Sequence, residues 1–133
     1  MKRNSMMVAA ILTFLLVGFI SLDHAQASPT IIDFELEIEL KDGTEYEIEY
    51  DVKKNQIEAK YAVPGEVVTY GQEALPKIEQ IFKQVNLVPN VEKDVVIKEL
   101  LNVFHIDRKA VSEFELDVKF DGGQRIKIDE KTL

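Results

Sequence analysis

Hydrophobic and charged residues alternate strictly along residues 34–50, which read FELEIELKDGTEYEIEY. Apart from Asp42 and the uncharged Thr44, the even positions are apolar: Phe34, Leu36, Ile38, Leu40, Tyr46, Ile48 and Tyr50. Six odd positions are glutamates: Glu35, Glu37, Glu39, Glu45, Glu47 and Glu49. A period of two indicates strands with one apolar face, and Asp-Gly between two such runs is typical of a hairpin. Residues 34–50 are therefore predicted to form a β-hairpin.

The parity of this pattern selects the loop of the hairpin. A two-residue loop would pair Leu40 with Glu45 and mix apolar and charged side chains on one face, whereas a loop over residues 41–43 pairs Leu40 with Thr44. The three-residue loop places Gly43 at the left-handed bulge position, which glycine adopts without steric cost. The same register brings the glutamates together as the pairs Glu39–Glu45, Glu37–Glu47 and Glu35–Glu49.

A second copy of the pattern occupies residues 114–129, which read FELDVKFDGGQRIKID. Its apolar positions match those of the first copy: Phe114, Leu116, Val118, Phe120, Ile126 and Ile128. The equivalent loop is residues 121–123. This loop sets Asp117 opposite Lys127 and Lys119 opposite Arg125, so the second hairpin mixes its charges.

The segment between the two hairpins predicts one strand and two helices. The strand runs from about Ile57 to Val63 and is followed by a turn at Pro64-Gly65. The first helix has helical spacing from Leu75 to Val85, with Pro76 in its opening turn. The second has Asn90 as a candidate cap and a buried side at Val96, Leu100 and Phe104.

These elements predict an α+β domain with the order βββααββ. Each hairpin has one apolar face and each helix has one apolar stripe. The economical arrangement is a four- or five-stranded antiparallel sheet, built from two similar hairpins, with both helices packed on one face.

The first 27 residues resemble a secretory signal peptide. Lys2 and Arg3 form a basic start, an apolar run follows, and Ala25-Gln26-Ala27 is a small-residue cleavage site. We expect cleavage between Ala27 and Ser28, an extracytoplasmic location, no membrane attachment after cleavage, and a single domain over residues 28–133. The alternative is an uncleaved anchor, but the apolar run is shorter than the ~20 residues that span a bilayer comfortably. The chain has no cysteine, which excludes disulfides and a lipid-modified cysteine.

The negative charge is concentrated in one short segment. The whole chain has 16 basic and 24 acidic residues, and the predicted signal removes Lys2, Arg3 and Asp23, leaving 14 and 23. Residues 33–51 contain nine acids and one lysine, so they supply −8 of the remaining −9. This distribution disfavours nucleic acid, anionic lipid and anionic wall polymers as partners, and it favours a basic or mixed-charge protein surface or a cation.

The two hairpin motifs, FELEIELKDGTEYEIEYD and FELDVKFDGGQRIKID, resemble those of the YusW-like family, a group of small exported proteins of Gram-positive bacteria. The resemblance runs from about Phe34 to Ile128. It implies a fold and an exported location. Because that family is one of unknown function, the resemblance supplies no catalytic residue.

Three like-charged pairs in one ribbon need an explanation, since each directly opposed pair costs up to ~1 kcal/mol. One hypothesis is a solvated face flanked by Lys119, Arg125 and Lys127, which would form ordinary cross-strand ion pairs. Another is docking of a basic partner, with electrostatics setting orientation. The third is a divalent cation of the calcium type, although the chain lacks the usual calcium-loop motif and no metal ligands or cofactor are assigned.

The sequence favours a non-catalytic protein-binding or regulatory module, with a cation-responsive domain as the alternative and a hydrolase as the least favoured class. Beyond residue 27 the only histidine is His105, and its combination with Ser112 and Asp107 does not amount to a triad motif. We expect His105 to have a structural role at a helix end. No catalytic residues are predicted.

Tyrosines provide the remaining candidate binding residues. Tyr46 and Tyr50 are in phase with Ile48 and are predicted to join the core. Tyr61 and Tyr70, on either side of the Pro64-Gly65 turn, are predicted to be an exposed pair. We expect any groove to lie between this turn and the first helix.

Overall fold

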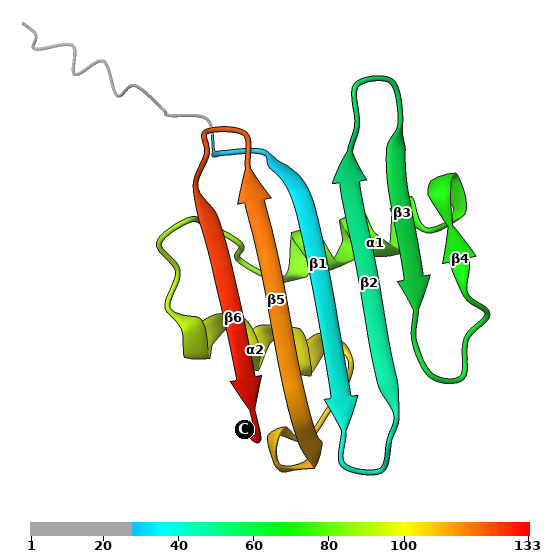
Figure 1. The fold of residues 1–133 in the computed structure, drawn as a ribbon, viewed down its shortest axis with the longest axis vertical. Coiled ribbons are helices and arrows are strands. Elements are labelled where there is room, and N and C mark those ends of the chain that lie inside the picture. The colour runs from blue at the N-terminus through cyan, green and yellow to red at the C-terminus, as the bar shows by residue number, and fades with distance from the viewer. Residues whose placement is uncertain (1–27) are drawn as a thin grey trace, which may run out of the picture.

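The computed structural model describes residues 28–133, which form one six-stranded antiparallel sheet with two helices (Figure 1). The predicted signal peptide, residues 1–27, lies outside the described residues. The strands are β1 (Ile31–Leu40), β2 (Glu45–Val52), β3 (Ile57–Ala62), β4 (Thr69–Tyr70), β5 (Val111–Phe120) and β6 (Arg125–Lys131). The helices are α1 (Leu75–Gln84) and α2 (Lys93–Val103), and two 3-10 turns are η1 (Gly71–Glu73) and η2 (Arg108–Ala110).

The sheet has the strand order β4-β3-β2-β1-β5-β6, and both helices lie behind it in Figure 1. The α+β class and the placement of both helices on one face are as predicted. The predicted strand number of four or five was wrong, because β4 adds a sixth strand by pairing Tyr70 with Lys60 and Thr69 with Tyr61. Two residues are too few to show a period along a sequence, so the order βββααββ missed this strand.

Both hairpins have the predicted three-residue loops. In the first loop the Leu40 N–H donates to the Thr44 carbonyl at 2.8 Å, and in the second the Phe120 N–H donates to the Gln124 carbonyl at 2.9 Å. Gly43 and Gly123 have φ values of 85° and 86°, which is the left-handed conformation that the bulge requires. The predicted pairings within each hairpin follow from these loops and are confirmed.

The two hairpins meet through their first strands, β1 and β5, at the centre of the sheet. Their antiparallel pairing brings Leu36 opposite Leu116 and Ile38 opposite Phe114. A register shift between Glu39 and Leu40 lets Val111 turn inward, where it is fully buried. The Ser112 hydroxyl donates to the Glu39 carbonyl at 3.0 Å beside this shift, so it holds the bulge in place.

Aromatic side chains fill the space between the sheet and the helices. The Phe82 ring of α1 packs edge-on against Phe34 and Tyr50, with centroid distances of 5.1 Å and 5.3 Å. The Tyr46 ring lies 5.3 Å from the Phe104 ring. These contacts confirm that Tyr46 and Tyr50 pack with the core.

The start of α1 agrees with the prediction from the sequence, and the start of α2 differs from it. Pro76 is the second residue of α1, where its missing N–H leaves no helical hydrogen bond unmade. The prediction that Asn90 caps the second helix was wrong: Glu92 is the N-cap of α2. Asn90 instead lies within the turn in which the Val91 N–H donates to the Val88 carbonyl, and two further residues pass before the helix starts.

His105 closes the end of α2. It has a φ of 55°, and its N–H donates to the Asn102 carbonyl at 3.2 Å. A left-handed residue here ends the helix and satisfies one of its last carbonyls. Within residues 28–133, no helix has the length and apolar character needed to cross a bilayer.

The second hairpin loop provides a matched pair of glycines for testing the register. Replacing Gly123 by alanine forces an L-residue into the left-handed conformation, and we expect the free energy of unfolding to fall by roughly 1–2 kcal/mol. Replacing Gly122 by alanine brings the new Cβ against only the movable Gln124 side chain, so a smaller loss is expected. Urea unfolding of both variants makes the comparison, and equal losses would contradict the assigned role of Gly123.

Candidate functional site

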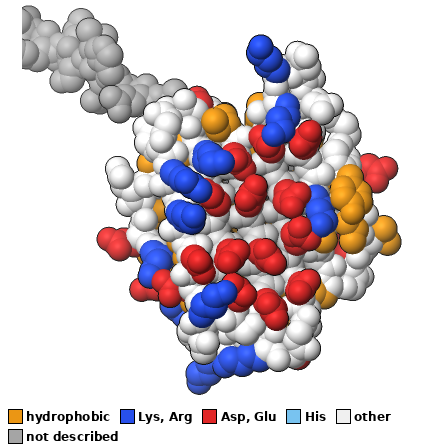
Figure 2. Space-filling model, viewed as in Figure 1, with side chains coloured by type: hydrophobic (Ala, Val, Ile, Leu, Met, Phe, Trp, Pro, Cys, Tyr) orange, Lys and Arg blue, Asp and Glu red, His pale blue; other side chains and the backbone are white. Residues whose placement is uncertain are grey.

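The candidate site is the sheet surface that faces away from the helices, which we call the acidic face. It carries the odd-numbered side chains of β1, β2, β6 and most of β5, and the even-numbered side chains of β3 and β4. Figure 2 views this face and shows acidic side chains gathered across its middle. All six glutamates predicted as binding residues lie on it: Glu35, Glu37, Glu39, Glu45, Glu47 and Glu49.

One row of the acidic face consists of four carboxylates on four adjacent strands. Glu37 of β1 is directly opposite Glu47 of β2 on one side and Glu115 of β5 on the other. Glu115 is in turn opposite Asp129 of β6. Strand spacing in a sheet is about 4.8 Å, so each carboxylate of this row has a like charge directly opposite it on a neighbouring strand.

Lys60 of β3 is the only basic side chain that reaches this row by an ion pair among the residues described. Its Nζ lies 2.5 Å from Glu47 Oε2. For Glu37, Glu115 and Asp129, no ion pair is formed within residues 28–133. The row is therefore neutralised at one end only.

A second row crosses all six strands and has mixed character. From β4 to β6 it consists of Tyr70, Lys60, Glu49, Glu35, Asp117 and Lys127. Its two lysines stand on β3 and β6, while its three acids occupy the central strands. The positive charge on this face thus lies toward the edges of the sheet.

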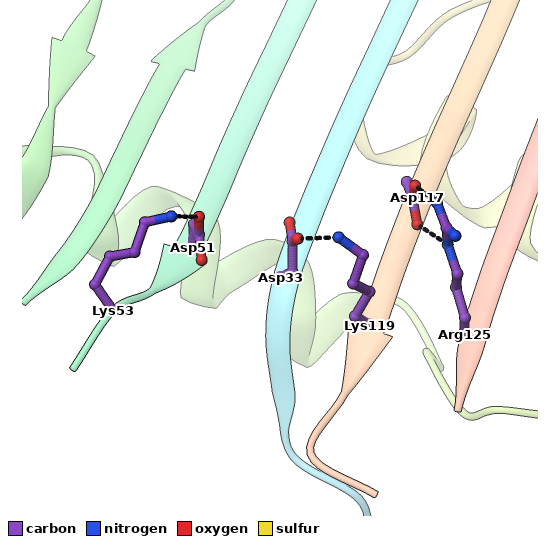
Figure 3. Close-up of polar contacts among 6 residues, drawn as sticks. All are labelled: Asp33, Asp51, Lys53, Asp117, Lys119 and Arg125. Atoms are coloured by element: carbon purple, nitrogen blue, oxygen red, sulfur yellow. Dashed lines mark hydrogen bonds and ion pairs between the residues drawn. The ribbon is translucent and has the colours of Figure 1, made fainter. Parts of the chain in front are cut away.

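Ion pairs concentrate at one end of the acidic face, as Figure 3 shows. Lys119 pairs with Asp33 across strands at 2.7 Å, and Arg125 Nε donates to Asp117 Oδ1 at 2.7 Å. Asp51 pairs with Lys53 in the same region. The expected flanking cations Lys119 and Arg125 do form cross-strand ion pairs, but with aspartates. Neither of these two cations pairs with a glutamate of the central strands.

Partial burial, together with neighbouring carboxylates, raises the pKa of two acids on this face. Burial, and then the neighbouring Glu47, raise the pKa of Glu49. Burial, and then Glu113, raise the pKa of Glu115. Like charges and partial desolvation both disfavour the ionised form, so these two sites hold protons more readily than an isolated glutamate.

The carboxylates with a basic partner behave in the opposite way. A hydrogen bond from Lys60 lowers the pKa of Glu47, and the hydrogen-bonded Arg125 guanidinium lowers the pKa of Asp117. Glu47 and Asp117 therefore differ from Glu49 and Glu115 in the direction of their pKa shifts, because a basic side chain donates a hydrogen bond to each of the first two.

A shallow, open hollow of about 370 Å³ lies over the middle of the acidic face. Its walls are formed mainly by carboxylates of four strands, including Glu35, Glu37, Glu47, Glu115 and Asp129. A positive group in this hollow would lie beside carboxylates of all four strands.

Tyr61 and Tyr70, predicted as an exposed pair, lie on opposite sides of the sheet, so that part of the prediction was wrong. Tyr70 is opposite Lys60 and belongs to the acidic face, with 63% of its surface exposed. Tyr61 faces the helices, where Lys77 of α1 lies 5.0 Å above its ring. Successive residues of a strand point to opposite faces. The pairing of Tyr61 with Ile48 places Tyr61 on the core side, and the pairing of Tyr70 with Lys60 places Tyr70 on the side of the glutamates.

Glu113, Glu115 and Asp129 were not singled out from the sequence but belong to the same face. Their carboxylate oxygens lie within 4.8 Å of one another, close enough to approach a single cation. Lys131 already pairs with Glu113, which reduces the charge available there. The alternation in residues 114–129 predicts that Glu115 and Asp129 lie on the charged side of the second hairpin, but no pattern in the sequence shows that β5 lies beside β1.

Comparison with known proteins identifies the fold family. The sequence profile described as YusW-like protein matches residues 32–122. The chain belongs to the YusW-like family. No curated protein and no solved structure matches it.

The match to the YusW-like family spans β1 through β5, including both helices and both strands of the central β1–β5 pair. It ends within the second hairpin loop, before β6 begins at Arg125. The family resemblance predicted from the two hairpin motifs is thereby confirmed. This family is one of unknown function, so the assignment defines no substrate, partner or activity.

The opposite pKa shifts of Glu115 and Asp117 predict opposite effects of neutralising substitutions. Folding raises the pKa of Glu115, so the stability linked to this group is complete in acid and is lost as pH rises through the folded pKa. Glu115→Gln should therefore be more stable than the parent at pH 7. Folding lowers the pKa of Asp117, so its stability is present at neutral pH and is lost as pH falls through the folded pKa.

Asp117→Asn should accordingly be less stable than the parent at pH 7. For Glu115→Gln the difference from the parent should shrink as pH falls through the raised pKa of Glu115, above the ordinary glutamate value. For Asp117→Asn it should shrink only below about 4, as pH falls toward the lowered pKa of Asp117. Urea unfolding of the three proteins over this pH range measures the effect. A Glu115→Gln protein that is less stable than the parent at pH 7 would contradict the assigned repulsion.

Proposed function

We propose that this protein is a non-catalytic binding module that acts outside the cytoplasmic membrane and engages a basic protein surface through its acidic face. The observation that carries the proposal is the row Asp129, Glu115, Glu37 and Glu47, in which four carboxylates are adjacent and only Glu47 has a cationic partner among the described residues. A basic partner would remove the repulsion within this row when it binds.

Charge and shape both support a macromolecular partner. The hollow is open and spread over several strands, whereas a small-molecule site is usually concave and mostly apolar. A flat, charged surface suits a partner that approaches over a large area, with the electrostatic field increasing the association rate.

The serine and the histidine considered for a hydrolase both make structural contacts. The Ser112 hydroxyl donates to the Glu39 carbonyl, and the backbone N–H of His105 donates to the Asn102 carbonyl at the end of α2. The Ser112 contact supports the non-catalytic part of the proposal, because the hydroxyl of a serine nucleophile donates to a general base and not to a backbone carbonyl.

Binding to a defined cationic probe tests the proposal. The purified protein should bind an immobilised peptide of lysines saturably, bind a glutamate peptide negligibly, and lose affinity as salt rises. The double variant Glu37→Gln/Glu47→Gln should weaken binding to the lysine peptide by at least fivefold, because it removes two charges from the hollow.

A matched control separates the acidic face from the overall charge. Glu79→Gln/Glu92→Gln removes the same number of charges from exposed positions in α1 and at the start of α2. This variant should bind the lysine peptide almost as well as the parent. Equal losses in the two double variants would mean that net charge alone drives binding, and the acidic face would no longer be the site.

A divalent cation is the second candidate ligand, favoured by the approach of Glu113, Glu115 and Asp129 oxygens to within 4.8 Å. If calcium binds there, millimolar calcium should raise the melting temperature saturably, and sodium at matched ionic strength should not. Asp129→Asn should abolish the calcium-specific rise. The same gradual rise with both salts would indicate screening of the acidic face and would exclude this candidate.

A further inference from the structure

An exposed apolar patch borders the acidic face at the β4 edge of the sheet. Val67 and Tyr70 are 84% and 63% exposed, and Val68 between them is also exposed. Figure 2 shows hydrophobic side chains at one edge of this face, directly beside acidic ones. Val67, Val68 and Tyr70 lie within four consecutive residues. Exposed apolar residues grouped in this way are typical of a surface that binds a partner, and Tyr is enriched where proteins bind partners.

Tyr70 is the member of this patch that shares a depression with carboxylates. A second open hollow of about 520 Å³ has Tyr70 as part of its wall and Glu35, Glu49, Asp51 and Glu58 among its acidic lining. Lys60 lies on the same surface, opposite both Tyr70 and Glu49, with its ammonium on Glu47. Lys60 shows that an alkylammonium group can lie on this face: it is the residue directly opposite Tyr70, and its ammonium pairs with a glutamate.

We propose that the partner of the acidic face is an extended segment of a cationic polypeptide that crosses the strands, with an apolar residue on Tyr70 and Val67 and lysine or arginine residues over the central carboxylates. This inference rests on the proposed function and specifies the chemistry of its partner. Charge complementarity selects a basic chain, and the apolar edge selects one that carries an apolar side chain as well.

The dimensions of the sheet set the spacing in that segment. Tyr70 and Glu35 belong to the same row and are three strands apart, which corresponds to about 14 Å at the usual strand spacing. An extended chain advances about 3.3–3.6 Å per residue, so about four residues cover this distance. The apolar residue should therefore precede or follow the first basic residue over Glu35 by about four positions.

A lipid surface is the other occupant that an exposed valine and tyrosine could suggest. The carboxylates beside the patch argue against it, because they would be repelled by anionic headgroups and would lose hydration against neutral ones. Binding of the protein to zwitterionic vesicles through Tyr70 and Val67 would therefore contradict the inference.

Two peptides with equal charge test the inference. Both contain six lysines; one carries leucine and phenylalanine about four positions before the first lysine, and the other has serine at those two positions. The apolar-basic peptide should bind the purified protein about tenfold more tightly than the serine peptide. Tyr70→Ser/Val67→Ser should remove most of that advantage while leaving the affinity for the serine peptide within twofold of the parent.

Val95→Ser is the matched control, since Val95 is also exposed but belongs to α2 on the helix layer. It should leave the tenfold advantage intact. Circular dichroism of each variant checks that the sheet is retained, and Tyr70→Phe, which keeps the ring, should preserve most of the advantage.

The outcomes separate the two proposals. If both peptides bind with equal affinity, or if the advantage survives Tyr70→Ser/Val67→Ser, this inference is overturned and the binding module stands. If neither peptide binds, both proposals fail. Binding to zwitterionic vesicles that disappears in the Tyr70 and Val67 double variant would assign the patch to a lipid surface and overturn the inference.

Discussion

The antiparallel pairing of β1 with β5 is the constraint on which the rest of the structure depends. It joins two hairpins that each have one apolar and one charged side, and it aligns the apolar sides against the same pair of helices. Because side chains alternate strictly between faces, this alignment also places the charged sides together. The hydrophobic core and the acidic face are therefore two results of one pairing.

Hydrophobic burial outweighs the electrostatic cost of that arrangement. Full burial of a leucine, isoleucine or phenylalanine side chain contributes about 1.5–3 kcal/mol, whereas a directly opposed like-charged pair costs up to about 1 kcal/mol and less in salt. Phe34, Leu36 and Ile38 alternate with Glu35, Glu37 and Glu39 along one strand, and the apolar members are almost completely buried. The strand therefore folds in this register despite its repulsive outer side, and the central carboxylates remain available to a partner.

The basic side chains that pair with acids are unevenly distributed over the acidic face. The proposed site is the part of the face that they do not reach. The ion pairs of Asp33, Asp51 and Asp117 stabilise one end, while Lys60 reaches the middle only at Glu47. Glu37 and Glu115 stand between these regions without a basic partner among the described residues. The Tyr70 edge adds apolar surface on the same face, with β3 and β2 between it and β1, so the two proposals concern one surface of a YusW-like protein.

The sequence by itself determined the hairpins, because a period of two and a left-handed glycine specify which residues face inward and how each loop closes. It also placed Pro76 in the first turn of a helix and put six glutamates on one side of a ribbon. Tertiary structure alone decided what lies beside that ribbon. Alternation within a strand carries no information about which distant strand becomes its neighbour, so the row from Glu47 to Asp129 could not be predicted. The separation of Tyr61 from Tyr70 depended in the same way on the register of β4, a strand too short to leave a periodic signal.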